Sequence, residues 1–255
     1  MDSQPDGTDR HTTADSPDGS SAGAASRLGG GTPVWQLRSL RRAVAAGVTA
    51  FVVGYLLTAV AFLVEMRALS LGGDSGSGNL VSTIIDQAVG VGGRQVVASS
   101  GGELALALRS VGWTFFSAQG VPLSGTAAGL GVSASGTVDV LTLAGKAVEI
   151  PLTPPLYYLI PPLCLAATGW WLASAGPVSS MREGAVTGGL VLAGYLPCVL
   201  VATLLLAFSA TVNLVVASGT ITARPVLWRA LVFGTGYAVV FGGLGGVVAA
   251  KIRAS

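Results

Sequence analysis

Residues 230–250 read ALVFGTGYAVVFGGLGGVVAA, a run without a charged side chain. A helix needs roughly 20 consecutive apolar residues to cross the hydrocarbon core of a bilayer, and this run is long enough. Lys251 and Arg253 follow it at once, and Trp228 precedes it, where an aromatic ring suits the membrane interface. The stretch predicts a transmembrane helix over about residues 226–250.

Three more segments are long and apolar enough to span a bilayer, at about residues 43–64, 156–175 and 184–208. The composition agrees with them, because 51% of the 255 residues are hydrophobic and only 10% are charged. A soluble domain carries about 25% charged residues. These values argue against a soluble enzyme, a nucleic-acid-binding protein and a disulfide scaffold. The predicted fold class is an all-α integral membrane protein with four transmembrane helices.

The N-terminal part is expected to hold a polar tail and a basic helix. Residues 1–33 consist mostly of Gly, Ser, Thr, Asp and Pro. They cannot bury enough apolar surface to offset the entropy of ordering, which predicts disorder. The following residues place Val34, Leu37 and Leu40 on one helical stripe beside basic side chains. This stripe predicts an interfacial helix that leads into the first span, within residues 34–64.

A long connection, residues 65–155, separates the first two spans and is expected to be an extracytoplasmic insertion of mixed α/β structure. Apolar spacing predicts an amphipathic helix over residues 80–88 and a Leu-rich helix over residues 103–118. Residues 121–136 are rich in Gly, Ser and Ala and are expected to form a loop. Residues 137–152 alternate well enough for one or two strands.

The distribution of Lys and Arg near the span ends predicts the orientation. With the N-terminus inside, the cytoplasmic ends collect Arg38, Arg41, Arg42, Arg182, Lys251 and Arg253. The outer ends then hold Arg67, Arg224 and Arg229. The predicted location is therefore the cell membrane, with several passes, both termini in the cytoplasm and residues 251–255 forming the cytoplasmic end. The connection over residues 209–224 is expected to lie outside.

Side chains that perform catalysis or bind metals are sparse. The one histidine, His11, lies in the polar tail, so no Ser–His or Cys–His pair can form. No spacing of His, Cys, Asp and Glu matches a metal site, and no Walker lysine is present. Cys164 and Cys198 fall inside apolar runs, which favours packing over a disulfide. We expect no enzymatic activity, no catalytic residue, no metal or other cofactor, and no nucleic-acid partner.

Small residues recur at every fourth position in two of the predicted spans. In the last span they are Ala230, Gly234, Ala238, Gly242, Gly246 and Ala250, and in the first span Ala46, Ala50, Gly54 and Thr58. This spacing lets helix backbones approach closely where dispersion drives association. The two ladders predict helix-packing seams. A seam within the chain's own bundle is favoured over a seam between copies in an oligomer.

Three prolines interrupt predicted spans, Pro161 and Pro162 in the second and Pro197 in the third. Each removes a backbone donor and frees a carbonyl. They predict either static kinks, the favoured interpretation, or the lining of a transport pathway. The span cores contain no ionisable residue, which disfavours a proton or ion pathway. Glu65 and Arg229 fall at outer span ends, where separate contact with water is favoured over an ion pair.

Two short motifs carry a resemblance: VGWTFF over residues 111–116, and LIPPL over residues 159–163 at the start of the second span. Together with the Asp-rich tail and the large outer segment, they resemble a family of uncharacterised haloarchaeal multi-pass membrane proteins. Members are sometimes labelled transporter-like, without assigned substrates. The resemblance covers about residues 40–250, implies an archaeal membrane protein, and supplies no catalytic or binding residue.

The sequence thus favours a non-enzymatic membrane protein, a scaffold or accessory subunit whose outer segment makes contacts. The alternative is a small transporter or channel component with a pathway near the proline-interrupted second and third spans. The expected partners are the lipid bilayer and either another membrane protein or a second copy of the chain.

Overall fold

The computed structural model describes residues 34–72, 102–129, 132–142, 154–214 and 217–254. The predicted tail over residues 1–33, the predicted helix over residues 80–88 and most of the strand region over residues 137–152 lie outside these ranges. The chain divides into Met1–Leu37 and a compact unit, Arg38–Ser255. Except for the first turn of α1, all the elements described below belong to the second unit.

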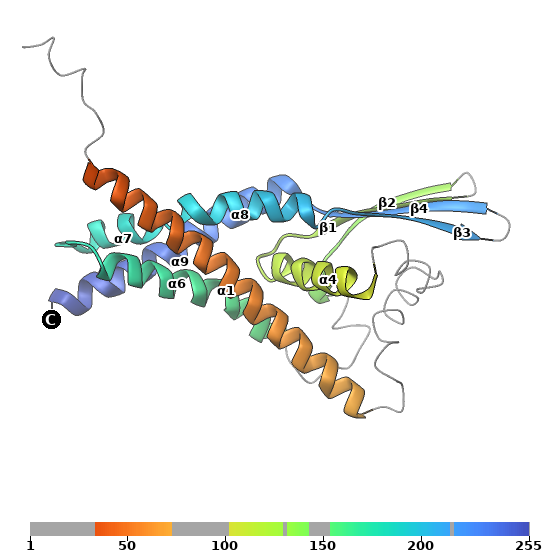
Figure 1. Ribbon diagram of the computed structural model, residues 1–255, viewed down its shortest axis with the longest axis horizontal. Helices are drawn as coiled ribbons and strands as arrows, with labels where there is room; N and C mark the ends of the chain where they lie inside the picture. The colour runs from red at the N-terminus through yellow and green to blue at the C-terminus, as the bar shows by residue number, and fades with distance from the viewer. Residues whose placement is uncertain (1–33, 73–101, 130–131, 143–153, 215–216, 255) are drawn as a thin grey trace, which may run out of the picture. The chain divides into compact units, whose positions relative to one another are not determined.

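The described chain is mostly helical, and four of its helical segments are long and apolar enough to cross a membrane (Figure 1). They are α1 (Val34–Gly72), α6 (Pro154–Ser174), α9 (Leu227–Ala254) and the pair α7 (Met181–Gly189) and α8 (Leu192–Leu205). The four helices predicted from apolar runs are therefore confirmed. The predicted interfacial helix and first span form one continuous helix, α1, which runs past the expected end at Val64 to Gly72.

The third candidate span is interrupted at Leu190 and Val191, between α7 and α8. There Gly194 N and Tyr195 N both donate to Val191 O, at 3.2 and 3.1 Å, so the helix tightens locally. The preceding pair Gly188 and Gly189 has low helix propensity, which favours a break at this point. The break is thus not at Pro197, and α6 likewise continues through Pro161 and Pro162.

Four antiparallel strands form one sheet in the order β2-β1-β4-β3. They are β1 (Leu123–Gly129), β2 (Val132–Val138), β3 (Phe208–Leu214) and β4 (Ala217–Pro225). The first two are a hairpin before α6, and the last two join α8 to α9. The central pairing of β1 with β4 therefore links segments about a hundred residues apart, for example Ser124 with Arg224.

The structure contradicts two sequence predictions in this region. The expected loop over residues 121–136 contains β1 and most of β2. Of the region 137–152, where one or two strands were expected, residues 137–138 belong to β2 but residues 140–142 form a helical turn. Asp139 begins that turn, because its Oδ1 accepts from Leu141 N at 2.9 Å and Thr142 N at 3.3 Å. The connection over residues 209–224 contains most of β3 and β4.

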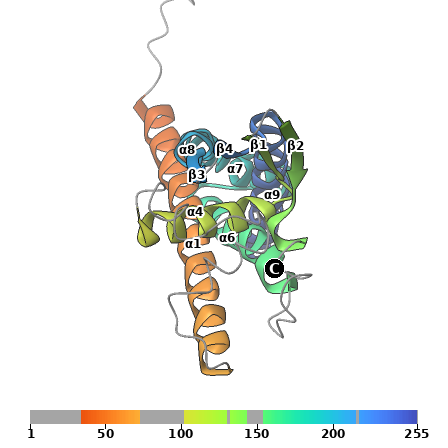
Figure 2. The same ribbon diagram turned by 90° about the vertical axis from the view of Figure 1, so that its right-hand side faces the viewer.

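Helix α4 (Glu103–Ser117) is confirmed at the predicted place, and its aromatic end packs among the long helices. Phe115 is 1% exposed, and its ring centroid lies 5.4 Å from that of Phe51 on α1. In both views of the ribbon, α4 lies beside α1 (Figure 1, Figure 2). The insertion between the first two candidate spans is thus partly built into the helical core.

The chain reverses direction sharply after α4. Gly120 has φ +77°, a conformation that L side chains rarely adopt. Gly120 N donates to Ser117 O at 2.9 Å, and Val121 N donates to Phe116 O at 3.0 Å, the pairing of a Schellman motif. Pro122 O then accepts from Val226 N at 3.1 Å. This reversal returns the chain from the core to the start of the sheet.

Candidate functional site

Gly242 of α9 lies where three helices meet. A Cβ atom built on Gly242 would lie 2.7 Å from Gly188 O of α7, and a Cβ built on Gly169 of α6 would overlap the carbonyl of Gly242. Four residues beyond it, Gly246 and Gly184 meet in the same way. Backbones therefore touch directly, the geometry that small residues permit.

The predicted seam residues of both ladders are all buried. On α9 these are Gly234, Ala238, Gly242 and Gly246, and on α1 they are Ala46, Ala50 and Gly54. Gly234 faces the side chain of Val199 on α8, at 3.4 Å from a built Cβ. Gly54 faces α4 as well as the long helices, because its built Cβ would lie 3.1 Å from Phe115 Cε2.

The closest approach of α1 to α8 involves two glycines that the ladders did not include. A Cβ on Gly47 would overlap Val191 O and Tyr195 N, and a Cβ on Gly194 would overlap Val44 O. Gly47 lies next to Ala46, one residue off the predicted stripe. On α7, Gly184 and Gly188 are also four residues apart, so the same spacing pattern predicts them as packing positions.

A buried hydrogen-bonded pair joins α4 to α8. Tyr195 Oη donates to Gln119 Oε1 at 2.8 Å, and Gln119 Nε2 donates to Phe115 O at 3.3 Å. Both side chains are at most 1% exposed. Throughout the described chain, every buried side-chain nitrogen or oxygen has a hydrogen-bond partner. The pair therefore fixes the end of α4 in the core. The sequence alone does not predict this pair, because no short-range pattern links residues 76 positions apart.

Removing this hydrogen bond is expected to weaken the α4 contact. Tyr195→Phe keeps the ring but leaves Gln119 Oε1 buried without its donor, at a cost of about 1–3 kcal/mol. The melting temperature in detergent should fall below that of the wild type. Tyr158→Phe is the matched control, since Tyr158 is exposed, and an equal melting temperature for both variants would contradict the role of the pair.

Glu65 and Arg229 do not pair with each other. Tyr157 Oη donates to Glu65 Oε2 at 2.6 Å, which ties α1 to α6, while the Arg229 guanidinium lies 5.3 Å from the centre of the Trp228 ring. The two charges are thus held separately.

Of the three prolines in the candidate spans, Pro161 is fully buried and Pro197 is exposed.

The two faces of the sheet differ in chemistry. Directly paired residues of antiparallel strands share a face, and the registers place hydroxyl side chains and one cation together. This polar sheet face comprises Ser124, Thr126, Ser133, Ser135, Thr137, Ser209, Thr211, Thr220, Thr222 and Arg224, with Ala128 as its one described apolar member. The opposite face carries Gly, Ala, Val, Leu, Ile, Phe and Pro, and its Phe208 packs against Trp113 of α4 at 6.1 Å between ring centroids.

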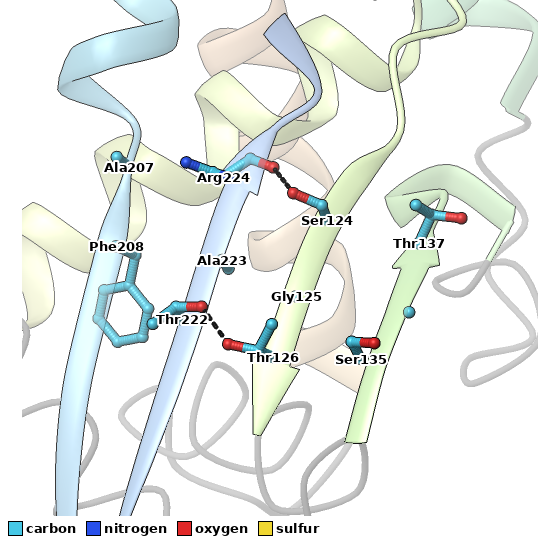
Figure 3. Close-up of a pocket in the computed structure, with 11 residues that line it drawn as sticks. Ser124, Gly125, Thr126, Ser135, Thr137, Ala207, Phe208, Thr222, Ala223 and Arg224 are labelled. Carbon is cyan, nitrogen blue, oxygen red and sulfur yellow. Dashed lines mark hydrogen bonds between the residues drawn. The ribbon is translucent and has the colours of Figure 1, made fainter. Parts of the chain in front are cut away.

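A cavity of about 760 Å³, open to solvent, lies against the polar sheet face at the end where the strands join α8 and α9 (Figure 3). Hydroxyls of β1, β2 and β4 and Arg224 line it, with Ala207 and Phe208 at one side. Thr126 Oγ1 and Thr222 Oγ1 are 2.6 Å apart, and Ser124 Oγ donates to Arg224 O at 3.3 Å. None of the three prolines and none of the ladder glycines lines this cavity.

The side chains of the polar sheet face can form hydrogen bonds and electrostatic contacts with a partner. In the described ranges no group of three His, Cys, Asp or Glu residues is placed to hold a metal ion. Cys164 and Cys198 are free thiols. The polar sheet face offers hydroxyl donors and acceptors and one guanidinium. These groups suit the recognition of an oxygen-rich or anionic partner.

Neither the curated proteins nor the solved structures contain a match to the chain. Residues 24–253 do match a protein family model, described as a family of unknown function (DUF7978). That match covers most of the sequence, and the chain belongs to this family of unknown function.

Proposed function

We propose that the protein is a non-enzymatic subunit of the cell membrane, a scaffold or accessory protein that spans the bilayer four times. Both termini lie in the cytoplasm, and the sheet lies on the outer side. Support for insertion comes from the helix surfaces, which expose large apolar side chains such as Leu63, Leu163 and Leu204. Such surface is costly in water and favourable in lipid.

The observation that carries the scaffold role is the polar sheet face. Its apolar opposite side is fixed to α4 through Phe208 and Trp113, and Trp113 Nε1 donates to Leu206 O at 3.1 Å. The sheet is thus held firmly on the helices while its hydroxyls remain exposed, for example at Ser135 and Thr220. A rigid polar surface of this kind suits contact with a partner, since little conformational entropy is lost on binding.

The scaffold role is tested by purification from native membranes in mild detergent, followed by native mass measurement. The wild type is expected to carry a stoichiometric partner, which the double variant Ser133→Arg/Thr220→Arg loses. Ala175→Arg is the control, because Ala175 is also exposed but lies at the other end of the helices, directly after α6. A wild-type protein that runs without any partner would contradict the scaffold role.

A transporter or channel component is the second candidate, and α4 is the observation that favours it. This helix enters the core with its aromatic end and the chain then turns back at Gly120. Half-spanning segments of this kind occur where they are buried in protein or line a pathway. In proteoliposomes this candidate predicts solute-dependent swelling that changes in Gln119→Leu. The scaffold role predicts that the liposomes stay tight.

A further inference from the structure

We propose that the cavity at the foot of the polar sheet face binds the phosphate headgroup of an anionic lipid of the outer leaflet. This inference rests on the proposed insertion of the four helices in the membrane. The lipid would occupy the part of the polar sheet face that lines the cavity, next to the helices. The protein partner proposed above would contact the part of that face farther from the helices.

The lining of the cavity offers hydrogen-bond donors to a ligand bound in it. In the pair Thr126–Thr222 the two oxygens are 2.6 Å apart, so one hydroxyl donates to the other and the second hydroxyl keeps its own proton. That proton, with those of Ser135 and Thr137 on β2, is available to a ligand oxygen. A phosphate has only acceptor oxygens when it is a charged diester, and these donors match it.

Arg224 supplies the positive charge. It is the one charged residue in the cavity lining, which contains no carboxylate. Its side chain is exposed, and its backbone oxygen already accepts from Ser124 Oγ at 3.3 Å. Within the described ranges no acidic side chain forms an ion pair with the guanidinium. An arginine fork in this position can bind a phosphate through two parallel hydrogen bonds.

The surroundings of the cavity favour a lipid over a free anion. Ala207 lines the cavity just after the end of α8, and its backbone N–H donates to the carbonyl of Leu204 in the last turn of that helix, at 3.4 Å. Leu204 is 72% exposed, and Leu227 at the start of α9 is exposed as well. A polar cavity with a cation therefore adjoins exposed apolar side chains. An amphiphile with a phosphate headgroup and acyl chains satisfies both parts.

The volume also fits a headgroup. The cavity measures about 760 Å³, within the range of roughly 300–1,000 Å³ typical of small-molecule sites. A headgroup with its phosphate and glycerol would fill part of it.

The proposal is tested by native mass spectrometry of the full-length protein in detergent. Phosphatidylglycerol, phosphatidylcholine and inorganic phosphate are titrated separately. We expect phosphatidylglycerol to bind in preference to phosphatidylcholine, and Arg224→Gln to bind it about tenfold more weakly, as expected from loss of a charge-assisted contact. Thr126→Val/Thr222→Val, which preserves side-chain shape, should also weaken binding.

Arg229→Gln is the matched control. Arg229 lies five residues after Arg224, in the first turn of α9, but its guanidinium lies over the Trp228 ring and the residue does not line the cavity. It should bind like the wild type. Equal weakening in Arg229→Gln and Arg224→Gln, or equal binding of the two lipids, would overturn the proposal in favour of unspecific charge attraction. Binding of inorganic phosphate at the same affinity as phosphatidylglycerol would overturn the lipid assignment.

Failure of this proposal is separable from failure of the proposed membrane role. Each variant is first reconstituted in vesicles and extracted with carbonate. Loss of selective lipid binding by a protein that stays in the vesicle fraction contradicts the lipid site alone, whereas release of the wild type from the vesicles contradicts the membrane role.

Discussion

The variant Gly242→Leu is expected to melt well below the wild type in detergent. A Cβ atom at this position would already lie 2.7 Å from Gly188 O, and a branched side chain needs still more space. The nearest neighbour cannot yield easily, because it is a backbone atom of α7. Overpacking of a core typically costs about 1–3 kcal/mol, and here the first obstacle is a backbone carbonyl, which cannot rotate away as a side chain can.

Val240→Leu is the control for this variant. Val240 lies on the same helix and is 53% exposed. Leucine suits an exposed position in lipid and has a higher helix propensity than Gly or Val. Equal melting temperatures for Gly242→Leu and Val240→Leu would contradict the close contact of α9 with α7.

Replacing Trp113, Phe115 and Phe116 together by Ser is expected to have the second large effect. Phe115 and Phe116 are each 1% exposed, and Trp113 links α4 to both α8 and β3. Truncating a buried Phe or Trp costs roughly 3–5 kcal/mol. The triple variant should lose the α4 contact, so that limited proteolysis cuts between α4 and β1 and the yield of intact protein falls.

The matched control changes apolar side chains on the exposed side of the same helix. Leu104 and Leu108 are 76% and 50% exposed. Leu104→Ser/Leu108→Ser should leave yield and protease resistance close to those of the wild type. Unchanged protease resistance in the triple variant would show that the aromatic end of α4 does not hold the segment in the core.

The helices could be predicted from the sequence because the apolar runs are long, and the first and last of them end at charged residues. The predicted span over residues 226–250 corresponds to α9, which continues through Lys251 and Arg253 to Ala254. Predicted ends were less accurate where another element follows directly. The third span was expected to reach Phe208, but Phe208 begins β3, because its side chain packs on Trp113.

The strands were missed because their side chains are small. In residues 132–138, Ser and Thr alternate with Ala, Gly and Val, so the alternation is present but its hydrophobic contrast is weak. The run from Phe208 to Thr211 alternates more clearly and would have supported a strand. The pairing of β1 with β4 joins residues far apart in the chain, and local patterns carry no information on it.

All members of the small-residue ladder on α9 lie in buried positions. The role of these residues in stability remains a prediction for the Gly242→Leu experiment. The contact between Gly47 and Gly194 was not predictable from one helix, because it depends on the crossing of α1 with α8 and on the break at Val191. The polar cavity could not be predicted either, since it requires the sheet.

The central claim is that four helices span the cell membrane with the sheet outside and α7 beginning inside. It is tested most directly by labelling single cysteines in intact cells with a membrane-impermeant maleimide, in a background without Cys164 and Cys198. Ser135 on β2 and Ser180 before α7 are both exposed and carry the two test cysteines. The account predicts that Ser135→Cys is labelled in intact cells, and that Ser180→Cys is labelled only after permeabilisation. Labelling of Ser180→Cys in intact cells, with none at Ser135→Cys until permeabilisation, would contradict the account.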